Sequence, residues 1–282
     1  MTEPVMISEL SPQPRSRIRM DLMHACVLAI IQGITEFLPI SSSGHLILIP
    51  ELFAWPDQGV SFDIALHFGS LIAILCFFRP MLIAHWHALK ASSPARAETI
   101  ALIRNIIVAT LPACFVGFFL HDKVDLYLRN PQVIAVTSIF FGLLLWWADS
   151  QKKVGHTQHL TVAQALLIGC FQAVALIPGT SRSGITITAG LLLGFSRQHA
   201  TEFSFLLAIP TIALAFFYEI FRGLKTDFGH IDLLPTIIAV IVTAITSYMT
   251  MSLLFHWIRK WRFTAFVIYR VLLGLGLMIF FW

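Results

Sequence analysis

Charged residues are scarce in this chain. Only 12% of its 282 residues are Asp, Glu, Lys or Arg, about half the share found in soluble globular domains. Hydrophobic residues make up 57%, and the mean hydropathy is +0.80. The net charge of +4 fits basic loops that face anionic lipid, and we expect no nucleic-acid partner. The composition excludes an ordinary soluble domain and predicts an all-α polytopic membrane protein.

Cysteine is also sparse, and its positions exclude the usual metal-binding patterns. The four cysteines are Cys26, Cys76, Cys114 and Cys170, and all lie in apolar segments without metal-type spacing. We expect them to be small core residues. The polar, Pro-rich arm at 1–20 lacks a small-residue cleavage site after its basic residues, so we expect it to be retained.

Long apolar runs are present, and six of them approach the roughly 20 residues that a helix needs to cross a bilayer. They cover residues 62–78, 101–119, 133–147, 202–221, 234–255 and 264–282. Two other apolar regions are split into half-length pieces by Pro and Gly. The pieces are 23–38 and 46–53 around a break at 39–44, and 162–177 and 185–195 around a break at 178–184. Such pieces predict re-entrant helix–loop–helix hairpins.

The two interrupted regions match each other at a constant offset. Gln32 aligns with Gln172, Ser41 with Ser181, Ser43 with Ser183 and Gly44 with Gly184. Duplicated, broken apolar segments are typical of inverted repeats whose site lies where the repeats meet. After the arm at 1–20 we therefore predict a single membrane domain over 21–282. It contains two inverted-topology repeats, about 22–149 and 161–282, each with one hairpin and about three transmembrane helices.

The loop charges indicate an orientation. Basic residues gather at 79–96, 152–153 and 259–262, and such loops usually face the cytoplasm. Both chain ends and the first hairpin then lie on the outer side, while the second hairpin enters from the inner side. The basic residues of the N-terminal arm argue against this orientation.

The first break carries several polar groups at membrane depth. Gln32 and Glu36 share one helix face, and a carboxylate there normally faces a partner, a metal or water. Glu36 is either a hydrogen-bond acceptor for the hinge backbone, or a metal ligand or general base for a nearby serine. His45 follows three serines, so a nucleophile, an acid/base group and a carboxylate lie within ten residues. The serines are Ser41, Ser42 and Ser43.

The second break carries a cation. Arg182 stands between Ser181 and Ser183, and a guanidinium among hydroxyls and a helix N-terminus is suited to binding phosphate. An ion pair with Glu202 or Glu219 is the alternative.

Other ionisable residues lie inside the predicted spans. Arg270 either extends to the membrane surface or adds a second positive charge to the same cavity. Asp63 and His67 either line its entrance or hydrogen-bond to each other. Together with the two breaks, these groups favour capture and cleavage of a phosphate anhydride that is attached to a lipid.

The sequence resembles the undecaprenyl-diphosphate phosphatases, the bacitracin-resistance family. The resemblance rests on residues 32–45 and 178–184, with supporting matches at 202–208 and 268–270, and runs from about Met23 to the C-terminus. It implies an integral bacterial plasma-membrane enzyme with its site facing the periplasm. The implied reaction removes the terminal phosphate of a C55 isoprenoid diphosphate and so recycles the carrier for peptidoglycan synthesis.

The resemblance also assigns roles. It implies that Ser42 is the nucleophile, that Glu36 and His45 assist it, and that Arg182 binds the diphosphate. A divalent cation, Mg²⁺ or Ca²⁺, is implied at Glu36, and less so at Gln32, because an amide brings no charge where the family often has Glu. The remaining expected diphosphate-binding residues are Ser41, Ser43, Ser181, Ser183 and Arg270.

Two alternative functions stay open from the sequence. The acid-phosphatase-like lipid phosphatases share Ser43-Gly44-His45, but their other sequence elements are absent here. A lipid-phosphate transporter or flippase uses the same inverted-repeat site, but has little need of both Ser42 and His45. The sequence also leaves open whether the protein forms a homodimer.

Overall fold

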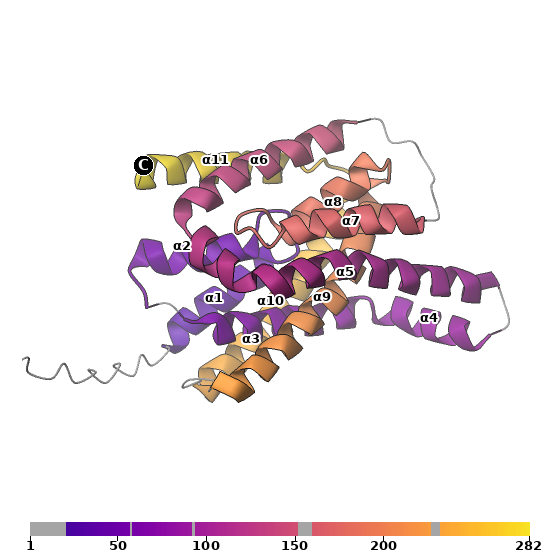
Figure 1. Cartoon of the computed structure of the whole chain (residues 1–282), viewed down its shortest axis with the longest axis horizontal. Helices are drawn as coiled ribbons and strands as arrows, with labels where there is room; N and C mark the ends of the chain where they lie inside the picture. The colour runs from indigo at the N-terminus through magenta and orange to yellow at the C-terminus, as the bar shows by residue number, and fades with distance from the viewer. Residues whose placement is uncertain (1–20, 57, 92–93, 152–159, 227–231) are drawn as a thin grey trace, which may run out of the picture.

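The computed structural model describes residues 21–56, 58–91, 94–151, 160–226 and 232–282. These residues form eleven α-helices and no strand (Figure 1), which confirms the all-α prediction. The helices are α1 (Leu22–Thr35), α2 (Ser42–Phe53), α3 (Val60–Phe77), α4 (Arg79–Lys90), α5 (Pro94–Leu128), α6 (Pro131–Ser150), α7 (Val162–Val174), α8 (Arg182–Leu192), α9 (Arg197–Thr226), α10 (Leu233–Ile258) and α11 (Thr264–Phe281). The arm at 1–20 and the basic pair at 152–153 lie outside the described residues.

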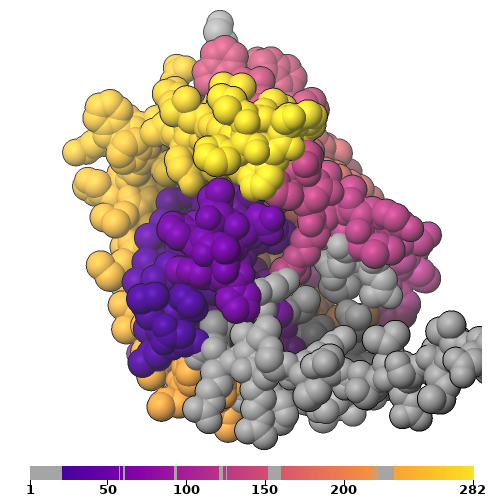
Figure 2. Space-filling model, turned by 90° about the vertical axis from the view of Figure 1, so that its left-hand side faces the viewer, coloured from indigo at the N-terminus to yellow at the C-terminus, as the bar shows by residue number. Residues whose placement is uncertain are grey.

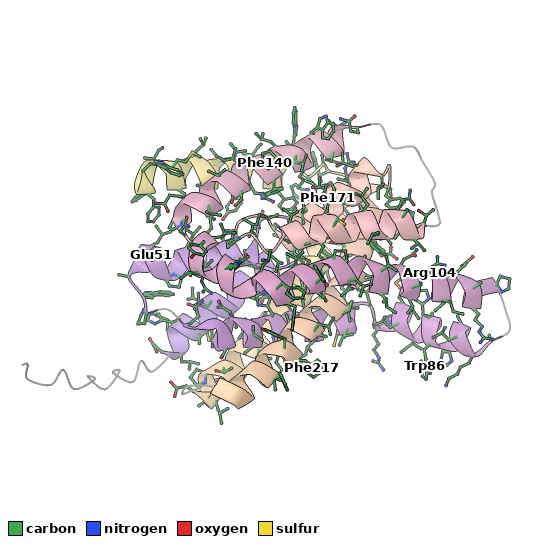
Figure 3. All side chains as sticks on the ribbon, in the orientation of Figure 1. Glu51, Trp86, Arg104, Phe140, Phe171 and Phe217 are labelled. Carbon is green, nitrogen blue, oxygen red and sulfur yellow. The ribbon has the colours of Figure 1, made fainter. Side chains whose placement is uncertain are left out.

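Five helices are long and apolar enough to cross a membrane, namely α5, α6, α9, α10 and α11. The pair α3 and α4, bent by 65°, brings the number to as many as six. Their outer faces are apolar: Phe140 on α6 is 60% exposed and Phe217 on α9 is 65% exposed (Figure 3). Apolar side chains on outward faces are expected where lipid is the solvent. The chain is therefore a multi-pass membrane protein.

The two predicted hairpins are pairs of short helices, α1 with α2 and α7 with α8, of 11 to 14 residues each. We call the segments between them the first hinge (residues 36–41) and the second hinge (residues 175–181). The sequence placed both breaks about three residues too late, because Ser41 and Ser181 cap the helices that follow. Ser41 Oγ accepts the Gly44 N–H at 3.4 Å, and Ser181 Oγ accepts the Gly184 N–H at 3.1 Å.

The caps give the two hinges the same local geometry. Ser41 has φ 74° and Ser181 has φ 72°, a backbone conformation that L-residues rarely adopt. As a result, two of the serines expected in the break, Ser42 and Ser43, form the first turn of α2 instead. The orientation of the repeats relative to a membrane stays a prediction.

Small residues bring the hairpins close to the long helices. Helix α1 packs against α10, and α7 packs against α5. A Cβ added at Gly169 of α7 would lie 2.5 Å from the Ala109 carbonyl oxygen and 2.9 Å from Ala109 Cα of α5. Small residues at such contacts are usual in membrane helix packing. This contact fixes α7 against α5, and thereby the second hinge in the middle of the protein.

We predict that Gly169→Leu destabilises the protein, because the new side chain meets backbone that cannot move aside. Overpacking of this kind costs about 1–3 kcal/mol or more. Thermal unfolding of the detergent-purified protein measures the effect. Gly276→Leu is the matched control, since a Cβ there meets nothing within 4 Å. Equal unfolding midpoints for the two variants would contradict the packing account.

Candidate active site

The two hinges meet at the Glu36 carboxylate, which is buried, with 6% of the residue exposed. From the first hairpin, Ser42 Oγ donates a hydrogen bond of 2.6 Å and Gln32 Nε2 one of 3.0 Å, both to Glu36 Oε2. From the second hairpin, Arg182 Nη2 donates to Glu36 Oε1 at 2.5 Å. One carboxylate therefore joins the two sequence motifs through Glu36 and Arg182, which are 146 residues apart.

This ion pair bears on the alternatives that the sequence left open for Arg182 and Glu36. Arg182 pairs with Glu36 and not with Glu202, and the side chain of Glu219 lies outside what the structure describes. Glu36 binds side chains of both hairpins rather than the hinge backbone. The predicted neighbours Gln32, Glu36 and Ser42 are brought together.

The arrangement is suited to phosphoryl chemistry. A carboxylate that accepts the hydrogen bond of a hydroxyl is placed to take its proton as the hydroxyl attacks. Among the described residues, Arg182 uses Nη2 for Glu36 and Nη1 for the Ser204 carbonyl at 3.4 Å, so it has further N–H donors for an anion. Helices α2 and α8 both begin here, and helix N-termini favour anions.

His67 of α3, for which the sequence left open the entrance of the cavity or a hydrogen bond with Asp63, lies beside the Glu36 carboxylate. Its Nε2 lies 3.4 Å from Glu36 Oε2, and its Nδ1 lies 2.7 Å from the Asp63 carbonyl oxygen. The Asp63 carboxylate instead accepts from Gln58 Nε2 at 2.7 Å and pairs with Arg129 at 3.5 Å. The sequence signal was the Asp63–His67 spacing, but spacing cannot show that α3 lies beside the first hinge.

His45 lies in a different environment from the one that its motif suggested. Its Nδ1 is 2.6 Å from the Ser41 carbonyl oxygen and its Nε2 is 2.5 Å from the Tyr269 hydroxyl. Both ring nitrogens are thus engaged, and neither contacts Ser42 or Glu36. Figure 2, which views the molecule from the left-hand side of Figure 1, shows α2 (purple) against α11 (yellow). In this structure His45 joins the first hinge to α11.

The other predicted serines mainly shape the hinges. Ser41 and Ser43 lie 3.3 Å apart and Ser181 and Ser183 lie 3.2 Å apart, measured between their Oγ atoms. Ser183 Oγ also donates to the Leu38 carbonyl at 2.9 Å, which links the first turn of α8 to the first hinge. Ser41, Ser181 and Ser183 are buried, whereas Ser43 is exposed. A role of these four serines in binding diphosphate stays a prediction.

Arg270 of α11 is surrounded by backbone carbonyls, and its role in binding diphosphate stays a prediction. It is 0% exposed, so it does not extend to the membrane surface. Its three nitrogens donate to five backbone carbonyls at 2.9–3.3 Å. The acceptors are Pro39 in the first hinge, Gly179 and Thr180 in the second hinge, and Thr137 and Ser138 in α6. Arg270 therefore ties both hinges to α6 and α11.

Few side chains at this site could serve as ligands of a metal cation. Among the described residues, no group of three or more His, Cys, Asp or Glu side chains is arranged to hold a metal ion. However, Gln32 Oε1 is buried beside Glu36 and has no hydrogen-bond partner there. Mg²⁺ is often held by one or two carboxylates together with substrate phosphates. The residues therefore fit a cation that is bound largely through a diphosphate.

Comparison with known proteins identifies the family. The pattern described as "Bacitracin resistance protein BacA" matches residues 25–276. The chain belongs to this family. It is 47% identical to the undecaprenyl-diphosphatase of Saccharophagus degradans and 45% identical to undecaprenyl-diphosphatase 1 of Pseudoalteromonas translucida, in each case over 93% of this chain and 99% of the relative. The undecaprenyl-diphosphatase of Magnetococcus marinus is 47% identical over 90% of this chain and 97% of the relative.

We predict that Arg270→Lys destabilises the protein and reduces its activity, because an ammonium group cannot serve five carbonyls at once. Each buried acceptor that loses its partner costs about 1–3 kcal/mol. Thermal unfolding in detergent measures the loss. The exposed Arg259, changed to Lys, is the control. Wild-type stability of Arg270→Lys would show that the hinges do not depend on this guanidinium.

Proposed function

We propose that this protein hydrolyses undecaprenyl diphosphate to undecaprenyl phosphate and inorganic phosphate. The observation that carries the proposal is the Glu36 carboxylate, which accepts hydrogen bonds from the Ser42 hydroxyl and the Arg182 guanidinium. This site lies in a chain whose relatives are named undecaprenyl-diphosphatase. The product is the lipid carrier of cell-wall synthesis, so the reaction recycles that carrier.

The first step transfers the terminal phosphoryl group to the protein. The diphosphate lies against Arg182 and the N-termini of α2 and α8. Ser42 Oγ attacks the terminal phosphorus while Glu36 accepts the hydroxyl proton. The bond from that phosphorus to the bridging oxygen breaks. Undecaprenyl phosphate leaves with this oxygen, which takes up the proton from Glu36.

The second step restores the enzyme. Water attacks the phosphorylated Ser42, and Glu36 accepts a proton from the water. The bond between phosphorus and Oγ breaks, Oγ takes the proton back from Glu36, and inorganic phosphate leaves. Gln32 and His67, which both contact Glu36 Oε2, keep the carboxylate in position throughout.

A divalent cation, Mg²⁺ or Ca²⁺, belongs to this proposal. Glu36 and the free amide oxygen of Gln32 would hold it together with oxygens of the diphosphate. When bound, the cation neutralises charge on the phosphoryl group.

We place the enzyme in the bacterial inner membrane with its site open to the periplasm. The charge pattern supports this placement, because α4, which has basic residues at both ends, lies at the end of the bundle opposite the C-terminus (Figure 1). Basic loops usually face the cytoplasm.

The transporter reading has no support in the comparisons, since the relatives are named for diphosphatase activity. A transporter would also have no use for the hydrogen bond between Ser42 and Glu36.

Phosphate release from undecaprenyl diphosphate by the purified protein tests the function. We expect release with Mg²⁺ or Ca²⁺, loss of release with a chelator, and recovery when the cation is restored. If folded protein released no phosphate, the function would be wrong. If a chelator left phosphate release unchanged, only the proposed requirement for a divalent cation would be refuted.

We predict that Ser42→Ala lowers kcat by about a thousandfold or more, because it removes the attacking oxygen, while lipid binding is retained. Phosphate release and lipid retention are measured on the same preparation. Ser252→Ala, on the exposed face of α10, serves as control. Near wild-type turnover by Ser42→Ala would move the nucleophile from this serine to water.

A further inference from the structure

A cavity of about 410 Å³ lies beside the candidate active site, between α5, α7 and α9. Arg182 lines it, and the same side chain pairs with Glu36. The volume falls in the range of small-molecule sites, roughly 300–1,000 Å³. The other lining residues are Ala113, Cys114, Gly117, Phe118, Gln172, Ala175, Leu176, Thr211, Leu214, Ala215 and Tyr218. The cavity is thus directly connected to the residue expected to bind diphosphate.

The walls of the cavity are mainly apolar. Besides Arg182, three lining side chains carry an amide or hydroxyl group: Gln172, Thr211 and Tyr218. Gln172 donates to the Ala109 carbonyl at 3.3 Å and accepts from Thr211 Oγ1 at 3.3 Å. These polar atoms are therefore used in packing α7 against α5 and α9. Apart from Arg182 and Tyr218, the rest of the wall consists of small, aliphatic and aromatic side chains, which favours a hydrocarbon ligand over a polar one.

The cavity opens sideways, toward the membrane. Phe118 on α5 is 69% exposed and Leu214 on α9 is 49% exposed, and both also line the cavity. Helices α5 and α9 are two of the candidate membrane spans, and Figure 1 shows them next to each other beside α7. A chain in the cavity would therefore pass between α5 and α9 directly into lipid.

The sequence duplication places an apolar side chain in this cavity where the first hairpin has a carboxylate. The offset that matches Gln32 with Gln172 also matches Glu36 with Leu176. Leu176 lines the cavity. Where the first hairpin carries the reacting carboxylate, the second carries a hydrocarbon side chain.

We propose that this cavity binds the first isoprene units of the lipid diphosphate, with the rest of the chain leaving between α5 and α9. The proposal rests on the function proposed above and extends it to the substrate tail. It explains why one cavity has the Arg182 side chain, apolar walls and a lateral opening together. Burial of these isoprene units adds binding free energy that the diphosphate alone does not provide.

Cys114 is a native reporter inside the cavity, and Cys170 is its matched control. Cys170 lies in a separate apolar hollow on α5 and α7 that contains no site residue. Two variants are compared, one that keeps Cys114 but not Cys170 and one that keeps Cys170 but not Cys114. Both also carry Ser42→Ala, so that the lipid is not consumed. The rate of modification by N-ethylmaleimide is followed by mass spectrometry, with bound lipid measured in the same sample.

We expect saturating undecaprenyl diphosphate to slow modification of Cys114 by about fivefold or more, and that of Cys170 by less than about twofold. Inorganic diphosphate, which has no chain, should leave Cys114 unprotected. Bound lipid with an unprotected Cys114 would overturn the cavity assignment while leaving the phosphatase function intact. If the folded wild-type protein released no phosphate, both proposals would fall.

A steric variant tests the same cavity by kinetics. A Cβ at Gly117 would lie 3.9 Å from Leu176 Cδ2, an ordinary contact, so Ala fits there and the ring of Phe would occupy the cavity. We expect Gly117→Phe to raise KM for undecaprenyl diphosphate about tenfold with kcat little changed, the pattern for lost substrate binding. Gly276→Phe, where an added Cβ meets nothing within 4 Å, should match the wild type. A wild-type KM for folded Gly117→Phe would overturn the proposal.

Discussion

The arrangement of the two hinges depends on the hydrogen bonds that the Arg270 guanidinium donates to backbone carbonyls. Two non-helical hinges lie inside a membrane protein, where lipid offers no donors to their backbone carbonyls. Arg270 donates to carbonyls of both hinges and of α6 from within α11. Five carbonyl dipoles in turn surround a charge that would otherwise be costly to bury. The same contact thus satisfies the hinges and holds them against each other.

The geometry of the candidate active site follows from these hydrogen bonds. Once the hinges are fixed side by side, the first turns of α2 and α8 start at one place, and Ser42 and Arg182 reach the same carboxylate. Ser183 reinforces the junction through the Leu38 carbonyl. A buried Glu36 is tolerated because it receives these charged and polar partners. The neighbouring cavity on the Arg182 side then gives an apolar chain a path to the lipid.

Sequence reasoning predicted the helical membrane fold and the two pairs of short helices, and it selected Glu36, Ser42 and Arg182, whose side chains the structure brings into contact. These features are readable because polar residues and Pro/Gly breaks stand out in apolar sequence. The hinge limits were misplaced since Ser41 and Ser181 act as helix caps, which depends on local hydrogen bonds.

Partners between distant elements could not be read from the sequence. The motif favoured His45 as the imidazole beside the carboxylate, but the packing of α3 brings His67 there and leaves His45 with Tyr269.

The central claim is that Glu36 and Arg182, one from each hairpin, act as a single unit. A double-mutant cycle on phosphate release, with Glu36→Gln, Arg182→Gln and the double variant, tests it most directly. The account predicts that the double variant loses about as much kcat/KM as the more damaging single change, whereas fully additive losses would contradict it.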